Sequence, residues 1–182
     1  SYYILPLFLM SSGTTMAQQY AVPSSSVVQT TSNKKEMDRF IKSLMSRMTL
    51  EEKIGQLSQY VGHDLLTGPQ SEALSDSLLS KGAVGSILNI GGVQKIKKIQ
   101  EKNMSVSRLK IPILFAYDVI HGYRTIFPTP LAEACSWDLD LMYKTAKAAS
   151  IEASASGIHW TFAPMVDIAR DPRWGRVVEG AG

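Results

Sequence analysis

Apolar residues follow a helical period at the start of the segment that looks folded. From Met37 to Met48 they recur at spacings of three and four residues, which puts them on one stripe of a helix. Thr49 and Glu52 then have the spacing of a capping box, in which the Thr hydroxyl accepts from the Glu amide and the Glu carboxylate reaches back. The pattern predicts one helix ending near Met48 and a second from Leu50 to about Tyr60.

Short apolar runs alternate with helical periods through the rest of the chain. Apolar strands that alternate with helices are typical of a parallel sheet with covering helices, so we expect an α/β fold. Three strands can neither close a barrel nor comfortably complete an open sheet, so this sheet should be unfinished at its C-terminal end. The strands are expected over 83–88, 111–117 and 161–166, and the helices over 72–80, 93–106 and 138–157.

The N-terminal residues have the pattern of an export signal. Apolar residues 2–10 are followed by Thr15-Met16-Ala17, which offers small residues where a signal peptidase cuts. We expect a signal peptide over 1–17 whose true start is missing, since the basic start is absent and the chain begins at Ser1. An uncleaved membrane anchor is the alternative, although the apolar run is short for a bilayer. Residues 18–33 read as a flexible leader, and the folded domain should cover 34–182.

Composition argues against several kinds of function. The net charge is only +3, and no run of Arg interleaved with aromatics is present, so we expect no nucleic-acid partner. The basic run 95–98 reads as the solvated face of a helix. Cys135 is the single cysteine, which excludes an internal disulfide, and we expect it to be a small packed side chain. His63 and His159 lack a second ligand at metal spacing, so no metal or cofactor is expected.

Polar residues follow the strand expected over 111–117. Asp118 comes directly after it, where an ionised carboxylate must be paired or must reach an open pocket. Such a carboxylate can accept two hydroxyl hydrogen bonds from a sugar, or it can cap a loop or pair with an Arg, and residue chemistry leaves both open. His121 could act as a base, but we favour a structural hydrogen-bonding role for it.

A second polar cluster follows the last expected strand, over residues 167–176. Some of its charges must neutralise one another, so we expect Arg170, Asp171 and Arg173 to hold the loop in shape. Arg176 is the better candidate for ligand contact, because Gly175 permits close approach and a planar guanidinium suits hydroxyl groups. Trp174 could stack on a sugar ring, but we expect it to be a core residue.

Five sequence blocks occur in one order and spacing that is specific to a known family. At these blocks the chain resembles the N-terminal domain of family 3 glycoside hydrolases, particularly exported bacterial β-glucosidases. One departure is that residues 129–133 are more polar than usual. The blocks are 48–57, 118–122, 125–128, 136–138 and 171–176.

The resemblance implies a fold and a location. It implies an incomplete (β/α)₈ TIM-type barrel of which this chain holds the first strands and helices, in a protein that usually continues into an α/β sandwich domain. Together with the expected signal peptide, it implies a periplasmic or secreted protein.

The resemblance also implies an activity and a division of roles. Asp118 and Arg176 match the family's carboxylate and arginine that bind the sugar at the cleavage subsite. The nucleophile and the acid/base would lie beyond the C-terminus, so no catalytic residue is expected here. The expected activity is that of a retaining β-glucosidase that hydrolyses terminal β-D-glucosyl residues of oligosaccharides. The alternatives are a β-xylosidase and a non-catalytic carbohydrate-binding or sensory protein.

Overall fold

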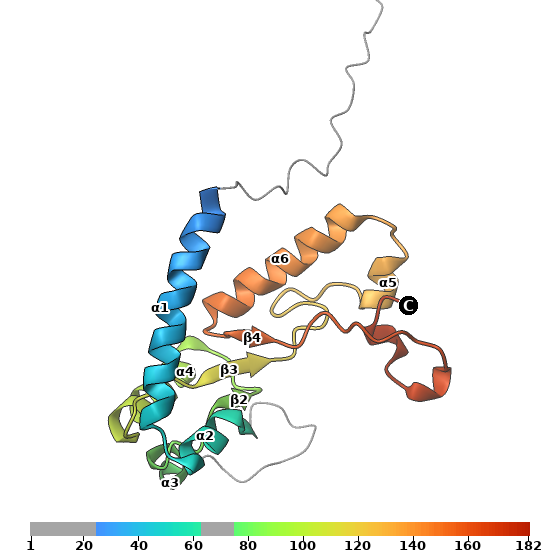
Figure 1. Ribbon diagram of the computed structural model, residues 1–182. Helices are drawn as coiled ribbons and strands as arrows, with labels where there is room; N and C mark the ends of the chain where they lie inside the picture. The colour runs from blue at the N-terminus through green and yellow to red at the C-terminus, as the bar shows by residue number, and fades with distance from the viewer. Residues whose placement is uncertain (1–24, 63–74) are drawn as a thin grey trace, which may run out of the picture. The chain divides into compact units, whose positions relative to one another are not determined.

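The computed structural model describes the backbone of residues 25–62 and 75–182, and side chains from residue 33 onward (Figure 1). The expected signal peptide, the first part of the expected leader, and His63 lie outside the described residues, as do residues 72–74 of one expected helix. The chain divides into two compact units, one ending at Arg47 and one beginning at Met48.

The first unit contains one described helix, α1 (Ser25–Arg47). It confirms the helical period from Met37 onward, and the apolar side chains of that stripe are largely exposed. The helix begins at Ser25 rather than near Lys34, so it extends into the segment expected to be an irregular leader. Once a helix has formed, each added residue gains a backbone hydrogen bond, which favours such an extension. The division into leader and domain stays a prediction.

The second unit is built on a parallel sheet with the strand order β1-β2-β3-β4. Helices α4 and α6 run beside the sheet, and the last segment of the chain leaves β4 as an irregular loop (Figure 1). The strands are β1 (Gln59–Val61), β2 (Ser86–Leu88), β3 (Leu114–Tyr117) and β4 (Trp160–Thr161). The helices are α2 (Leu50–Leu57), α3 (Asp76–Ser80), α4 (Val93–Val106), α5 (Pro130–Ala134), α6 (Leu139–Ala155), and the 3₁₀ turns η2 (Pro172–Trp174) and η3 (Val177–Glu179).

One face of this sheet is covered by helices and the other is partly exposed. Ile87 pairs in register with Phe115, and both are almost fully buried against Ile96 of α4 and Ala153 of α6. On the opposite face, Leu114 of β3 is 50% exposed and Trp160 of β4 is 43% exposed, whereas their paired neighbours are buried. The sheet therefore resembles a section of barrel wall, with helices outside and a partly exposed inner face.

Strand β1 corrects the sequence prediction. Thr49 and Glu52 form the expected capping box, but the helix ends at Leu57 instead of about Tyr60. Residues Gln59–Val61 pair parallel with β2, so the sheet has four strands among the described residues, not three. Pairing with a neighbouring strand and packing of Tyr60 against the core outweigh the local helical period there.

Other element boundaries differ in smaller ways. Asp138 caps α6 as predicted, accepting from the amides of Asp140 and Leu141. The last strand covers Trp160–Thr161 rather than the expected 161–166, and Pro164, which has no amide to donate, could not continue the pairing further along. Helix α5 was not predicted from the sequence.

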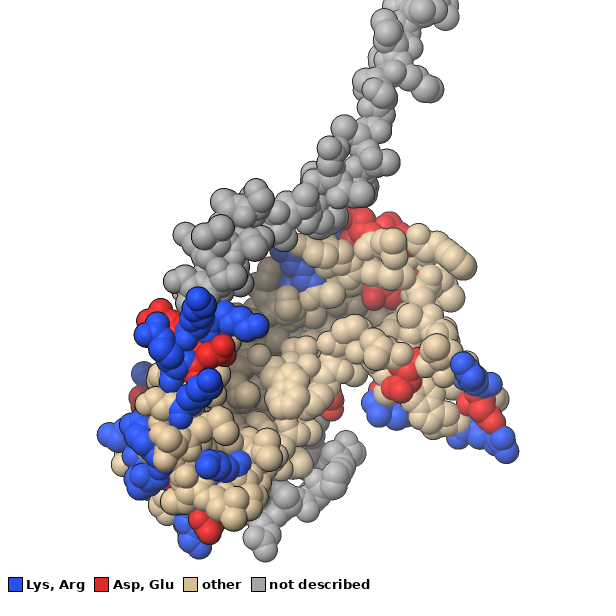
Figure 2. All heavy atoms as spheres, viewed as in Figure 1, with Lys and Arg blue, Asp and Glu red and all other residues tan. Residues whose placement is uncertain are grey.

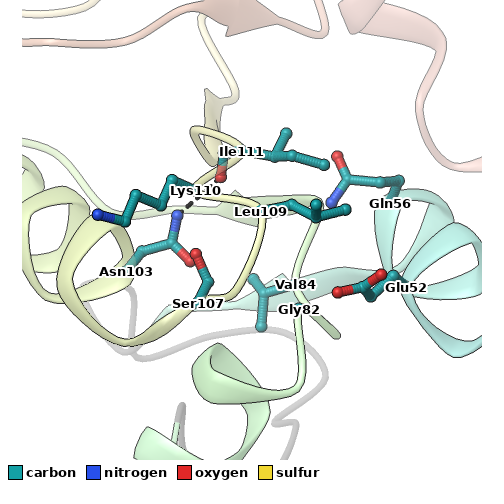
Figure 3. Close-up of a pocket in the computed structure, with 9 residues that line it drawn as sticks. All are labelled: Glu52, Gln56, Gly82, Val84, Asn103, Ser107, Leu109, Lys110 and Ile111. Carbon is teal, nitrogen blue, oxygen red and sulfur yellow. Dashed lines mark hydrogen bonds between the residues drawn. The ribbon is translucent and has the colours of Figure 1, made fainter. Parts of the chain in front are cut away.

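A half-buried ion pair ties α2 to the segment before β3. The carboxylate of Glu52 is nearly buried and accepts from Arg108 Nε at 3.0 Å and Nη2 at 2.6 Å, and from the Thr49 amide at 2.9 Å. Hydrogen bonding from Arg108 lowers the pKa of Glu52. Glu52 also lines a small pocket between α2, α4 and the entry to β3 (Figure 3). The pair holds together elements at the amino end of the sheet.

We expect Glu52→Gln to destabilise the fold, because a half-exposed guanidinium would lose its carboxylate partner. The expected loss is about 1–3 kcal/mol in the free energy of unfolding at neutral pH, reduced from that of a fully buried pair by solvent screening at Arg108. Urea unfolding measures it. Glu101→Gln is the control, because Glu101 pairs with Lys97 on the exposed face of α4. Equal effects of the two substitutions would contradict the importance of the Glu52 pair.

The stabilisation from Glu52 should depend on pH with a definite sign. The pKa of Glu52 is lower in the folded state than the value of about 4.3 of a free glutamate. Its contribution is therefore complete above that unfolded value and disappears as the pH falls through the folded-state pKa. The difference in unfolding free energy between the wild type and Glu52→Gln should be constant near neutrality and shrink in acid. A difference that grows in acid would be incompatible with this pair.

Candidate functional site

The polar residues selected from the sequence lie at the carboxyl edge of the parallel sheet. Asp118 directly follows β3, and the chain after β4 carries Asp167 and Arg176. Because all four strands are parallel, the loops after them open on the same edge, where α/β proteins bind their ligands. The pocket of Figure 3 lies at the opposite edge, since Val84 and Ile111 precede β2 and β3.

The loop after β3 is closed by its own hydrogen bonds. The amide of Phe127 donates to the carbonyl of His121 at 2.7 Å, and His121 Nδ1 lies 3.1 Å from the carbonyl of Phe127. Gly122 has a φ of 116°, and a side chain there would meet the carbonyl oxygen of Thr125. His121 thus has the structural role favoured by the sequence.

Helix α6 anchors this loop through a single carboxylate. Glu152 accepts from the amides of Arg124 at 2.8 Å and Thr125 at 2.9 Å, and from the Thr125 hydroxyl at 2.6 Å. These hydrogen bonds lower the pKa of Glu152, and the bond from the Thr125 hydroxyl has the largest effect. Glu152 therefore holds the end of the loop that begins at Asp118.

The loop after β4 contains one of the charge pairs expected from its composition, that of Asp171 and Arg173. Asp171 caps η2 through the Arg173 amide at 2.9 Å and forms an ion pair with the Arg173 guanidinium. Figure 2 shows acidic and basic side chains side by side on this projecting part. Gly175 has a φ of 86° and ends the turn. Trp174 is 40% exposed, so its assignment to the core was wrong; it lies in the short turn η2, none of whose residues is buried.

Arg176 is surrounded by acidic groups. Its guanidinium is hydrogen-bonded to Glu179, and this bond is the main reason that its pKa is raised, with the charges of Asp118 and Asp167 acting in the same direction. The Arg176 hydrogen bond lowers the pKa of Glu179, and the charge of His121 adds to that effect. The fold therefore places the two sequence-selected residues, Asp118 and Arg176, on the loops after two neighbouring strands, and the charge of Asp118 acts on Arg176. These two residues, with Asp167 and Glu179, are called the charge cluster below.

This cluster has the chemistry to hold a polyhydroxylated ligand. Asp118 and Arg176 are both exposed, one offering acceptor lone pairs and the other N–H donors. Among residues 33–62 and 75–182, no group of three or more His, Cys, Asp or Glu side chains is arranged to hold a metal ion. The expected packing of Cys135 was wrong, because its thiol is exposed where α5 ends.

Three residues at this edge were not selected from the sequence. Glu179 follows Arg176 by three residues in a turn, a spacing that could have suggested the pair. Asp167 lies near the start of the loop that leads from β4 to Glu179. Asn89 follows β2 with a φ of 60°, and its buried Oδ1 has no hydrogen-bond partner among the described residues. Nothing in the local sequence distinguishes Asn89 from an ordinary turn residue.

Comparison with known proteins assigns this arrangement to a family. The family model described as the glycosyl hydrolase family 3 N-terminal domain matches residues 49–182. The chain belongs to glycosyl hydrolase family 3. The matched range contains all four strands and both loops at the carboxyl edge.

Family 3 relatives resemble the chain over most of its length. Periplasmic beta-glucosidase of Salmonella typhimurium is 44% identical over 147 residues, which are 80% of this chain and 18% of that protein. Beta-xylosidase of Formosa agariphila is 29% identical over 99% of this chain and 20% of its own length. The chain thus spans about a fifth of the length of these relatives.

A solved family 3 structure has the same fold in this region. The beta-glucosidase of Listeria innocua, in complex with isofagomine, matches with a TM-score of 0.70 and 44% identity over 79% of this chain and 20% of that one. The open sheet with its covering helices is accordingly part of a TIM-type barrel, as the sequence resemblance implied. Within residues 25–62 and 75–182, no helix is both long and apolar enough to cross a bilayer.

We expect Glu152→Gln to loosen the loop after β3, because a neutral amide would replace the carboxylate that accepts three hydrogen bonds. Amide hydrogen exchange of Arg124 and Thr125 should become faster, while exchange in the middle of α6 should be unchanged. Lys144→Gln is the matched control, since it breaks only the Asp140–Lys144 pair on the same helix. Unchanged exchange at Arg124 and Thr125 would contradict the anchoring role.

Proposed function

We propose that this chain forms part of the glycone-binding site of a retaining β-glucosidase that acts on terminal β-D-glucosyl residues. The observation that carries the proposal is the placement of Asp118 and Arg176, which are both exposed on the loops after two neighbouring parallel strands, at the carboxyl edge of a family 3 barrel. The beta-glucosidases of Salmonella typhimurium and Listeria innocua, each 44% identical, support glucose as the sugar.

The proposed roles follow from the hydrogen-bonding capacity of the two side chains. The carboxylate of Asp118 accepts hydrogen bonds from neighbouring hydroxyls of the terminal sugar, and the guanidinium of Arg176 donates to oxygens of the same ring. Together they orient the ring for attack at its anomeric carbon. Retaining hydrolysis needs two further carboxyl groups about 5 Å apart, one as nucleophile and one as acid/base. In this proposal they come from sequence beyond residue 182, since the family 3 relatives are about five times longer.

A β-xylosidase is the second candidate. The Formosa agariphila beta-xylosidase matches across 99% of this chain, although with lower identity. A non-catalytic carbohydrate-binding protein on the same barrel is a further alternative. For location, we propose export to the periplasm or outside the cell, supported by the pattern of residues 1–17 and by the periplasmic relative from Salmonella typhimurium.

Asp118→Ala should impair hydrolysis of an aryl β-glucoside by the full-length protein that carries this chain. Losing charged hydrogen bonds to the sugar should lower kcat/KM roughly 100-fold or more. Asp76→Ala is the control, because Asp76 is an exposed acid of α3 that pairs with Lys102. An unchanged kcat/KM in Asp118→Ala would remove Asp118 from the site, and an inactive wild type would favour the non-catalytic alternative.

The choice between glucose and xylose can be tested with matched substrates. If the site accepts glucose, kcat/KM for an aryl β-glucoside should exceed that for the corresponding β-xyloside, which lacks the hydroxymethyl group and its contacts. The reverse order would favour the β-xylosidase.

A further inference from the structure

The guanidinium of Arg176 has one edge occupied and one edge open. Its Nε lies 3.0 Å from both carboxylate oxygens of Glu179, and its Nη2 also donates to that carboxylate. A guanidinium carries five N–H donors in a planar fork. With the Nε edge held by Glu179, the donors of Nη1 and the second donor of Nη2 point away from this carboxylate and have no other partner among the described residues.

Glu179 is the better-anchored member of this pair. Its side chain is 30% exposed, compared with 56% for Arg176. Its amide donates to the carbonyl of Arg176 at 3.1 Å in the turn η3, which packs against α5. The next residue, Gly180, is buried and forms a parallel bridge with Met165, in the segment after β4. The backbone that carries the Glu179 carboxylate is therefore paired with the segment that leaves β4.

A neighbouring pair shows what an ordinary surface ion pair looks like in this loop. The side chain of Arg173 is 89% exposed, and its partner Asp171 also caps the turn that precedes Gly175. Exposed pairs of this kind contribute little to stability. The Arg176 pair differs, because its carboxylate is 30% exposed, compared with 47% for Asp171, and because the turn that carries it packs against α5. The charges of Asp118 and Asp167 also act on the Arg176 guanidinium.

The competition between these carboxylates affects what the cluster can bind. If Arg176 turned to pair with Asp118, the N–H donors of the guanidinium and the oxygens of the carboxylate would bind each other. They would then no longer be available to the hydroxyls of a sugar. A guanidinium held by Glu179 instead leaves both oxygens of Asp118 available to hydroxyl donors. Pairing of Arg176 with Glu179 is therefore the arrangement that leaves the Asp118 carboxylate available to a ligand.

We infer that Glu179 is a positioning residue that holds Arg176 away from Asp118, so that both present open hydrogen-bonding edges to the terminal sugar. The inference rests on the proposed function and adds to it a residue that does not itself touch the substrate. It explains why Arg176, the residue of this loop selected for ligand contact, is found in an ion pair.

The test is a double-mutant cycle in the full-length protein, assayed with an aryl β-glucoside. In Glu179→Gln, one amide N–H would face the guanidinium donors, so Arg176 should lose its orientation and kcat/KM should fall roughly 10- to 100-fold. In an Arg176→Ala background the same substitution should have almost no further effect, because Glu179 acts through Arg176. Glu179→Asp, which keeps a carboxylate, should recover part of the activity.

Arg173→Gln is the matched control, because it breaks the other ion pair of the same loop and should leave kcat/KM within about two-fold of wild type. Unchanged activity in Glu179→Gln, or an equal loss with and without Arg176, would overturn the positioning role while leaving the proposed function intact. A wild type without glycosidase activity would instead contradict the proposed function, and the role of Glu179 with it.

Discussion

Parallel pairing of four strands is the constraint on which the rest of this structure depends. It forces every strand to end at the same edge, so the loops that begin at Asp118 and contain Arg176 open side by side although they are distant in sequence. It also requires each connection to cross the sheet, which is why α4 and α6 cover one face and bury Ile87 and Phe115. The amino edge carries the Glu52–Arg108 pair, whose role is to hold elements together. Strand direction therefore separates the edge that carries this ion pair from the edge that carries the candidate site.

Much of this fold could be predicted from the sequence, and the error at β1 shows the limit. The capping box at Thr49 and the cap at Asp138 are local hydrogen-bond patterns, and the structure confirms both. Strand β1 has only three residues and continues the helical period of α2, so its identity depends on pairing with β2. That contact is non-local, and no spacing in the sequence records it. The same limit applies to Cys135 and Trp174, whose exposure depends on whether a second layer of residues covers them.

Only part of the candidate site could be predicted, because sequence position marks unusual residues but does not show their contacts. Asp118 and Arg176 could be selected because each stands in an unusual position, after an apolar strand and after a permissive glycine. The ion pairing within the second loop followed from its charge balance, and the Asp171–Arg173 pair agrees with it. The partner of Arg176 was missed, because Glu179 lies outside the polar segment 167–176 and becomes important only through the turn η3. Sequence identified which groups are present, whereas the geometry decides which of them are already engaged.

The most direct test of the account is a crystal structure of the full-length protein with glucose bound. The account predicts that the carboxylate of Asp118 and the open edge of the Arg176 guanidinium both lie within hydrogen-bond distance of hydroxyls on one sugar ring, with Glu179 still paired to Arg176. Glucose bound at a place that neither Asp118 nor Arg176 contacts would contradict it.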